Sequence, residues 1–205
     1  SGQSALGAGN AEAARFCTKV GVIGDSKSTH RLGAGTEIER RLKQRFIPYY
    51  FSAAGRRSIV RPGNTEDFHT GSGLQTVKAA KRAGANCFII ALGGNDAVDT
   101  RGDVKEIDRR INAMMRTIGP GYKVDWITSR TSSAKTGPWA NSTIQVFSRR
   151  IEAARHRFRN LEVNHWERVR ETKPGWYRKD GVHLKAGNPA RAKYTVDSLF
   201  IRGSR

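Results

Sequence analysis

Six consecutive apolar residues, from Cys87 to Leu92, place the strongest constraint on the fold of this chain. A run without polar residues is typical of a strand buried on both faces, and such a strand needs a parallel sheet with helices on either side. A helix is predicted at 104–118, because apolar residues recur there at a spacing of three and four. The sequence Gly119-Pro120-Gly121 ends it. The middle of the chain therefore predicts a strand–helix unit of an α/β fold.

The same alternation continues on both sides of this unit. Further strands are predicted at 19–23, 46–51, 124–128 and 161–163, and further helices at 74–82, 141–158 and from Asn188 onward. A helix is also predicted near Thr36, with Thr36 as its N-cap and Glu39 three residues later. Pro48 favours an edge position for its strand. Strands alternating with helices predict a parallel sheet covered on both faces.

The length of 205 residues fits one domain, which we expect at 16–205 behind a flexible, Gly/Ala/Ser-rich lead-in at 1–15. The chain begins Ser1-Gly2-Gln3, without a methionine or an apolar signal segment, and we expect a processed or cloned fragment. No apolar run approaches the roughly 20 residues that span a bilayer.

The formal charge of +19 favours contact with anionic matter such as acidic envelope polymers or phospholipid surfaces. The basic residues are spread along the chain, and no arginine-rich tail or aromatic-interleaved surface stands out, which argues against nucleic acid as a partner. We therefore favour solvated helix faces in an anionic neighbourhood over a dedicated polyanion site.

Four short motifs follow in a fixed order, each at a predicted strand end or in a loop. They are Gly24-Asp25-Ser26, an isolated Gly55, Gly93-Gly94-Asn95-Asp96, and Asp180-Gly181-Val182-His183. In parallel α/β sheets, ligands bind beyond the carboxyl ends of the strands. The predicted topology therefore gathers Ser26, Gly55 and Asn95 at one edge of the sheet.

The residue types in these motifs suit acyl transfer. A serine hydroxyl needs a base, which His183 can supply, and a carboxylate at Asp180 can fix the imidazole tautomer. The backbone N–H groups of Ser26 and Gly55 and the side-chain amide of Asn95 are candidate oxyanion donors. Each motif alone has an ordinary structural explanation as a turn or a helix cap. Together, in this order, they predict a serine esterase.

The four motifs resemble the sequence blocks of the SGNH (GDSL-type) hydrolases, and the resemblance runs from about Lys19 to Phe200. It implies a flavodoxin-like three-layer α/β/α sandwich with about five parallel strands, an acyl-serine intermediate, and neither a metal nor another cofactor. It also implies Ser26 as nucleophile, His183 as base and Asp180 as its partner. By the same resemblance, Ser26, Gly55 and Asn95 would form the oxyanion hole.

The chain departs from the common family pattern after the serine, where Lys27 replaces the usual apolar residue. This favours a small acyl group on a polar or acidic backbone, with Lys27 as a candidate substrate-binding residue. Trp139 is a second candidate, as a wall for a sugar ring or as ordinary packing, and Trp176 has the same two interpretations.

We therefore expect hydrolysis of short acyl esters, above all O-acetyl esters, on a cell-envelope glycan that can be anionic. Three alternatives stay open: acyl transfer to a sugar hydroxyl, a lysophospholipase, and a non-enzymatic polyanion-binding module on a hydrolase fold. The sequence does not indicate the oligomeric state.

The resemblance also bears on the two cysteines, because it makes the strands that follow Cys17 and begin at Cys87 neighbours. A disulfide between them is one hypothesis, and two buried free thiols are the other. The disulfide would favour an oxidising, extracytoplasmic setting such as a bacterial cell envelope. The remaining histidines show no ligand-like spacing and are expected on the surface or in loops; they are His30, His69, His156 and His165.

Overall fold

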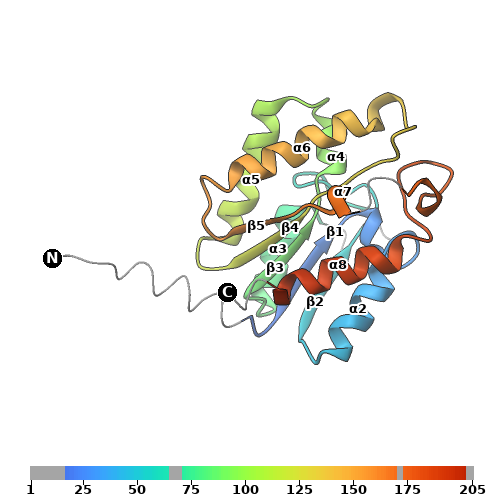
Figure 1. Cartoon of the computed structure of the whole chain (residues 1–205). Helices are drawn as coiled ribbons and strands as arrows, with labels where there is room; N and C mark the ends of the chain where they lie inside the picture. Colours follow the sequence, from blue (N-terminus) through green and yellow to red (C-terminus); the bar gives the residue numbers. More distant parts are fainter. Residues whose placement is uncertain (1–16, 65–70, 170–172, 202–205) are drawn as a thin grey trace.

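The computed structural model describes residues 17–64, 71–169 and 173–201. Five parallel strands form one sheet in the order β2-β1-β3-β4-β5 (Figure 1). Their bounds are Val20–Gly24 (β1), Tyr49–Ala53 (β2), Cys87–Ala91 (β3), Lys123–Ile127 (β4) and Leu161–Asn164 (β5). The predicted parallel sheet is confirmed, and β2 lies at its edge as Pro48 indicated. The expected lead-in at 1–15 lies outside the described residues.

Helices cover both faces of the sheet and complete three layers (Figure 1). On one face lie α2 (Gly35–Gln44), α7 (Trp166–Val169) and α8 (Asn188–Ile201). On the other lie α3 (Gly73–Arg82), α4 (Gly94–Asp99), α5 (Val104–Ile118) and α6 (Asn141–Ala154). Single 3₁₀ turns lie in the connections, at Ser26–Ser28 (η1), Gly137–Trp139 (η2) and Pro174–Trp176 (η3). The three-layer α/β/α class expected from the resemblance is confirmed.

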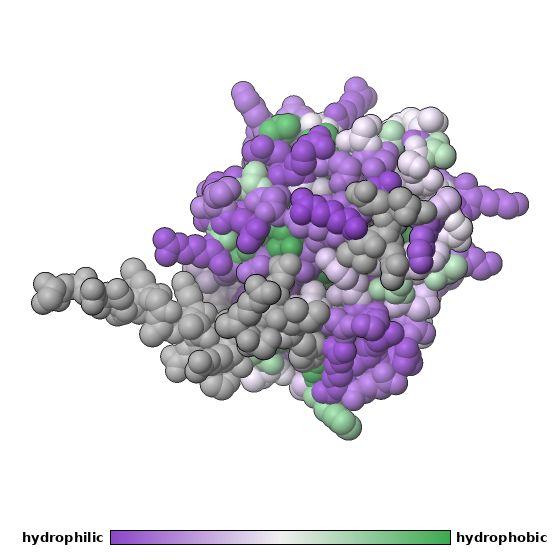
Figure 2. Space-filling model, in the orientation of Figure 1, coloured by the Kyte–Doolittle hydropathy of each residue, from purple (hydrophilic) through white to green (hydrophobic). Residues whose placement is uncertain are grey.

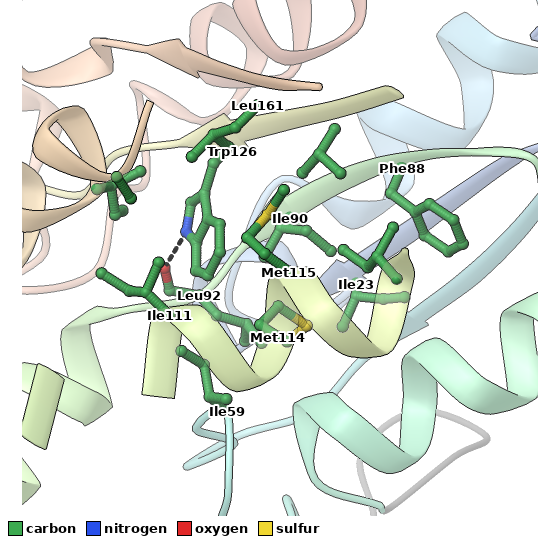
Figure 3. Packing of buried hydrophobic residues seen from close by; sticks show 14 of the residues in the cluster. Ile23, Ile59, Phe88, Ile90, Leu92, Ile111, Met114, Met115, Trp126 and Leu161 are labelled. Carbon is green, nitrogen blue, oxygen red and sulfur yellow. Dashed lines mark hydrogen bonds between the residues drawn. The ribbon is translucent and has the colours of Figure 1, made fainter. Parts of the chain in front are cut away.

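The larger apolar core lies between the sheet and α3, α5 and α6 (Figure 3). Trp126 of β4 is fully buried there, and its indole Nε1 donates a hydrogen bond to the Leu92 carbonyl at 2.8 Å. This satisfies the one polar group of a large side chain whose burial stabilises the fold. Met114 and Met115 of α5 are buried in the same cluster, so the helix spacing predicted from them reflects core packing.

The helix α2 begins near Thr36 as predicted, but its N-cap differs from the prediction. Its N-cap is Ala34, without a side-chain cap, and Thr36 lies inside the helix. The preceding loop fixes this start, because the Ala34 N–H donates to the Lys27 carbonyl at 2.9 Å and a side chain at Gly33 would collide with the Lys27 backbone. Glu39 contacts His30 and accepts a hydrogen bond from Tyr49 Oη instead of completing a capping box.

The β2 strand starts three residues later than predicted. Phe46 has a φ of 56° and the Ile47 N–H donates to the Leu42 carbonyl, so these residues end α2 rather than begin a strand. Pro48 precedes β2, and its carbonyl accepts from the Val20 N–H at 3.0 Å. A proline there removes no N–H from the sheet ladder.

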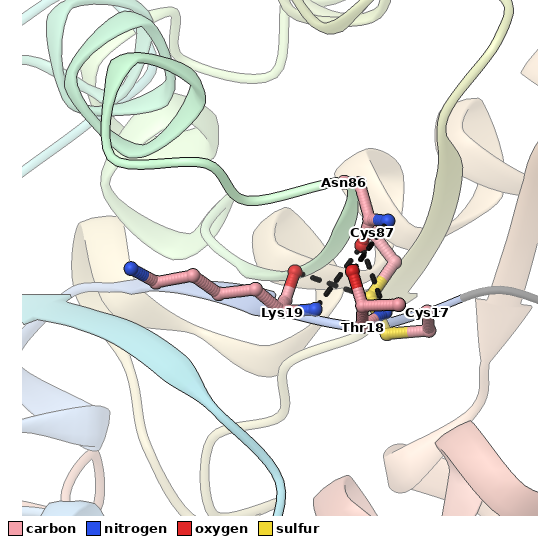
Figure 4. The surroundings of a disulfide bond; sticks show 5 residues. All are labelled: Cys17, Thr18, Lys19, Asn86 and Cys87. Atoms are coloured by element: carbon pink, nitrogen blue, oxygen red, sulfur yellow. Dashed lines mark hydrogen bonds between the residues drawn. A yellow bond between two sulfur atoms is a disulfide. The ribbon is translucent and has the colours of Figure 1, made fainter.

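A disulfide joins Cys17 to Cys87 with their Cα atoms 5.5 Å apart (Figure 4). Cys87 is level with Val20 in the sheet, so Cys17 reaches it from three residues before β1. Asn86 supports the same corner by accepting hydrogen bonds from the Thr18 and Lys19 N–H groups at 3.0 and 3.2 Å. The bridge ties the amino ends of two central strands, at the end of the sheet opposite the four motifs.

The surface in Figure 2 is largely hydrophilic, with only scattered hydrophobic residues. The large hydrophobic side chains exposed among the described residues are Phe46, Val60 and Val104. None of the helices that the structure describes is long and apolar enough to cross a membrane.

Candidate active site

Ser26 lies immediately beyond the carboxyl end of β1, at the first position of η1. The Asp25 side chain caps this turn by accepting a hydrogen bond from the Lys27 N–H at 2.9 Å. A side chain at Gly24 would contact Ser28, so glycine lets the turn fold tightly against the strand end. The Gly-Asp-Ser motif is therefore both a capped turn and the support that directs the Ser26 hydroxyl outward.

Ser26, His183 and Asp180 form a continuous hydrogen-bonded chain. Ser26 Oγ lies 2.8 Å from His183 Nε2, and His183 Nδ1 lies 2.6 Å from Asp180 Oδ2. The carboxylate accepts the proton of Nδ1, so Nε2 is free to accept the serine proton. The structure thus brings together the three residues predicted as nucleophile, base and orienting acid.

A tight turn sets the spacing of Asp180 and His183. Gly181 has a φ of 68°, and the Arg178 N–H donates to the His183 carbonyl at 2.7 Å. Asp180 Oδ1 accepts from the Val182 and His183 N–H groups at 2.8 and 2.9 Å. Partial burial by itself raises the pKa of Asp180, but the hydrogen bonds from His183 and Val182 outweigh it and lower the pKa to about 2. Asp180 is therefore an anion throughout the neutral range.

The three predicted oxyanion donors lie around the same cavity as Ser26. Within the described residues, no group accepts a hydrogen bond from the backbone N–H of Ser26 or from that of Gly55. A Cβ at Gly55 would lie 2.5 Å from Asn64 Oδ1, so a side chain there would displace the Asn64 side chain from the cavity wall. Asn95 Nδ2 donates one proton to the Arg57 carbonyl at 2.9 Å, which leaves its second proton for a ligand.

The Asn95-Asp96 pair begins α4 rather than forming a simple turn, and both side chains hold the loop that carries Gly55. Asp96 Oδ1 and Oδ2 each lie 3.2 Å from the Ile59 N–H, and Arg110 donates to Asp96 at 2.9 Å. Burial raises the pKa of Asp96 to about 6, although Arg110 acts in the opposite direction. The third motif therefore fixes the second motif in place.

Arg57 is a supporting residue that the sequence analysis missed. Its guanidinium is fully buried and donates to the carbonyls of Gly24, Ser52 and Gly71 at 3.2, 3.0 and 2.9 Å. It thereby links the carboxyl ends of β1 and β2, where Ser26 and Gly55 lie. The only sequence signal was an arginine two residues after the glycine, which is indistinguishable from a surface arginine in so basic a chain.

A cavity of about 350 Å³ opens beside Ser26. Besides the triad and the oxyanion donors, its lining includes Lys27, Leu32, Arg56, Asn64, Trp139 and Val182. Trp139 lines the cavity and also packs against the larger core, so its position is compatible with both of its interpretations. Trp176 stacks on Trp166 with ring centroids 6.3 Å apart, which favours its packing interpretation.

Lys27, the residue that departs from the common family pattern, lines the cavity and is buried. Its Nζ donates to Ser129 Oγ and lies 5.9 Å from the centroid of the Trp139 ring. Burial is the main cause that lowers the pKa of Lys27 to about 8, and the positive charge of Arg191 adds to it.

No protein-family model matches the sequence, and no curated protein matches it. Solved structures do match over most of the chain. A lipase/acylhydrolase from Enterococcus faecalis has a TM-score of 0.70 at 16% identity, covering 88% of this chain and 94% of that one. The catalytic domain of peptidoglycan O-acetyltransferase A from Streptococcus pneumoniae has a TM-score of 0.60 at 13% identity, covering 90% and 91%. A G-D-S-L family lipolytic protein from Veillonella parvula has a TM-score of 0.64 at 12% identity, covering 90% and 98%.

Proposed function

We propose that this chain, which has the fold of the SGNH hydrolases, is a serine esterase that removes short acyl groups from a glycan. One observation carries the proposal: Ser26 Oγ, both nitrogens of His183 and Asp180 form a single hydrogen-bonded chain beside a cavity. A serine in a purely structural turn needs neither a base at 2.8 Å nor an acid behind that base.

The reaction follows from this geometry. His183 Nε2 accepts the Ser26 proton while Ser26 Oγ forms a bond to the ester carbonyl carbon. The negative charge on the carbonyl oxygen is stabilised by the N–H groups of Ser26 and Gly55 and by Asn95 Nδ2. The C–O bond to the alcohol then breaks and His183 gives its proton to that alcohol. A water molecule releases the acid from the acyl-serine by the same steps.

The cavity supports a short acyl group. Its volume of about 350 Å³ is near the lower end of ligand pockets, and two cationic side chains, Lys27 and Arg56, line it. Long acyl chains need a longer continuous apolar channel than a cavity of this volume, with charged side chains in its wall, provides. An O-acetyl ester on a polar or anionic glycan suits these walls better than a lysophospholipid.

The decisive experiment is hydrolysis of p-nitrophenyl esters of increasing acyl length by the wild type and by Ser26→Ala. We expect Ser26-dependent turnover that is fastest for acetate and falls by about tenfold or more toward long chains. Preference for long chains would favour the lysophospholipase instead. Turnover that survives Ser26→Ala would refute the assignment of the nucleophile.

Acyl transfer to a sugar hydroxyl is the second candidate, supported by the structural similarity to the O-acetyltransferase domain. An acyl-serine serves both reactions, and only the acceptor differs. The wild type would be given an acetyl donor with and without glycan oligosaccharides. Acetylated sugar formed faster than free acetate would favour the transferase.

An extracytoplasmic location is part of this proposal. The disulfide between Cys17 and Cys87 supports it, since such bonds persist in oxidising compartments. A polyanion-binding module without activity is the less favoured alternative, because such a module needs no aligned Ser26, His183 and Asp180. Salt-dependent binding to an acidic polymer in the absence of any turnover would favour it.

A further inference from the structure

The side chain of Lys27 is directed into the wall of the catalytic cavity by its own backbone. The Lys27 N–H donates to Asp25, its carbonyl accepts from the Ala34 N–H, and Gly33 packs against the same peptide. The direction of the side chain is therefore fixed. Its Nζ reaches Ser129 beyond β4, near the first residue of α4, where a Cβ on Gly94 would lie 3.4 Å from it.

The ammonium of Lys27 is buried without a carboxylate partner among the described residues. Its only hydrogen-bond acceptor there is the Ser129 hydroxyl, so two of its three N–H donors are unused. The acids nearest to it are already engaged: Asp25 accepts the Lys27 N–H, and Asp180 accepts from His183. Asp25 and Asp180 act on Lys27 through their charges only, so the cost of burying an ammonium with unused donors is met only in part, and a substrate anion would lower it further.

A second cation faces the same cavity. Arg56 directly follows Gly55, is exposed at the cavity mouth and has a φ of 61°, in the left-handed region that costs an arginine about 1 kcal/mol. Across the cavity, both carboxylates of the lining accept hydrogen bonds within the protein, whereas Lys27 keeps two unused N–H donors. The donors that the site offers to an anionic ligand are therefore those of Lys27 and of the exposed Arg56.

From this arrangement we propose that Lys27 is a specificity-determining residue that binds a carboxylate of the substrate close to the scissile ester. This inference rests on the proposed esterase function and names its substrate class: esters that carry a carboxylate within reach of Ser26. The carboxylate belongs either to the acyl group, as in a half-ester of a dicarboxylic acid, or to the alcohol, as in an acylated acidic sugar. In both cases the carboxylate accepts a charge-assisted hydrogen bond from an unused N–H donor of Lys27 Nζ.

Two pairs of esters test the proposal and separate these sources. For the acyl side, p-nitrophenyl hemisuccinate is compared with p-nitrophenyl butyrate. For the alcohol side, 3-acetoxybenzoate is compared with phenyl acetate. In each pair the ratio of kcat/KM for the charged ester to that for the neutral ester is measured in the wild type, Lys27→Met and Lys27→Gln.

We expect the ratio in one pair to fall by about 10- to 100-fold in both Lys27 variants, the effect of one charge-assisted hydrogen bond. The pair that responds identifies whether the carboxylate lies in the acyl group or in the alcohol. Because both esters are assayed on one protein preparation, the ratio does not depend on how much of a variant is folded. Lys105→Met, which removes an exposed lysine on α5, controls for net charge and should leave both ratios unchanged.

Unchanged ratios in both pairs, with Ser26-dependent hydrolysis of the neutral esters, would overturn the inference and leave the esterase function standing. If the wild type hydrolyses none of the four esters, the proposed function fails separately. In that case calorimetry measures the affinity of monomethyl succinate and of 3-acetoxybenzoate for Ser26→Ala, with and without Lys27→Met. A loss of affinity in the double variant would support the role of Lys27. Equal affinity in the two proteins would overturn the role of Lys27.

Discussion

His183 and His165 are two imidazoles with similar hydrogen-bond lengths and different chemical capacities. His183 has Asp180 at 2.6 Å from Nδ1 and the Ser26 hydroxyl at 2.8 Å from Nε2. His165 has carboxylates on both sides, with Glu167 at 2.7 Å from Nδ1 and Glu152 at 2.7 Å from Nε2. The two sites differ in the group that faces Nε2, which is a hydroxyl at His183 and a carboxylate at His165.

A carboxylate at neutral pH only accepts hydrogen bonds, so the site around His165 is satisfied when both of its ring nitrogens carry protons. The imidazole is then a cation that links α6, the end of β5 and α7. Burial by itself raises the pKa of Glu152, but Arg155 and His165 outweigh it and hold that pKa below its usual value, which agrees with a cationic partner. His183 faces a hydroxyl instead, which can donate its proton. One histidine is built as a base and the other as a structural link.

The largest expected effect comes from removing each imidazole in turn. His183→Ala should lower kcat for p-nitrophenyl acetate by about 10³- to 10⁶-fold, because no other side chain in the described part of the chain is hydrogen-bonded to Ser26 Oγ to take its proton. His165→Gln should leave kcat within about threefold. Turnover is measured against Ser26→Ala as the background. A similar loss in both variants would show that the comparison is wrong.

Removing one carboxylate from each site should give the next largest effect. In Asp180→Asn, the amide oxygen can still accept from the Val182 and His183 N–H groups, so the turn is kept. Its NH₂ group then faces Nδ1 and forces the proton onto Nε2, which disables the base. We expect kcat to fall by about 10²- to 10⁴-fold.

The matched variant is Glu152→Gln, which changes one carboxylate of His165 in the same way. It should leave kcat unchanged, since that imidazole takes no part in the reaction. Equal activity of Asp180→Asn and the wild type would remove Asp180 from the proposed mechanism.

The sequence predicted the acidic partner of His183 and missed both partners of His165, for a physical reason. Asp180 and His183 are three residues apart, so a local turn suffices to join them, and the motif is visible in the sequence. The partners of His165 come from α6 and α7, and Glu152 is 13 residues away. His165 lies in a connection, as expected, between β5 and α7, but its side chain is 17% exposed and bonded to a carboxylate on each side, which no local pattern indicated.

The same distinction holds for the fold. The bounds of α5 match the prediction at 104–118, because its apolar spacing and the Gly-Pro-Gly stop are local signals. The Thr36 cap predicted for α2 was wrong, because the packing of the 27–35 loop places the N-cap at Ala34. The support of Gly55 by Arg57 and Asp96 depends on contacts between different strand ends, which no local pattern encodes.

The dependence of activity on pH provides a further test of the two sites. The pKa of Asp180 is lowered to about 2, so its carboxylate stays ionised, and orienting, at every pH above about 3. We expect log kcat/KM for a neutral ester to fall with a slope of one, about tenfold per pH unit, as acid protonates the single base. The measurement runs from pH 4 to pH 8. A slope approaching two would mean that Asp180 titrates together with His183, and a changed profile in His165→Gln would mean that His165 acts in the reaction.

The smallest expected effect is on stability and belongs to His165. In His165→Gln, Glu152 and Glu167 lose a common cation, and we expect the free energy of unfolding to fall by about 1–2 kcal/mol at pH 7, limited because Glu152 is partly exposed. The folded pKa of Glu152 is depressed, so its contribution is present above its unfolded value of about 4.5 and is lost as the pH falls through the lower folded value. The difference between wild type and variant should therefore shrink at pH 4. Urea unfolding followed by tryptophan fluorescence at pH 7 and pH 4 measures it, and equal stability at pH 7 would mean that the two ion pairs contribute nothing to the fold.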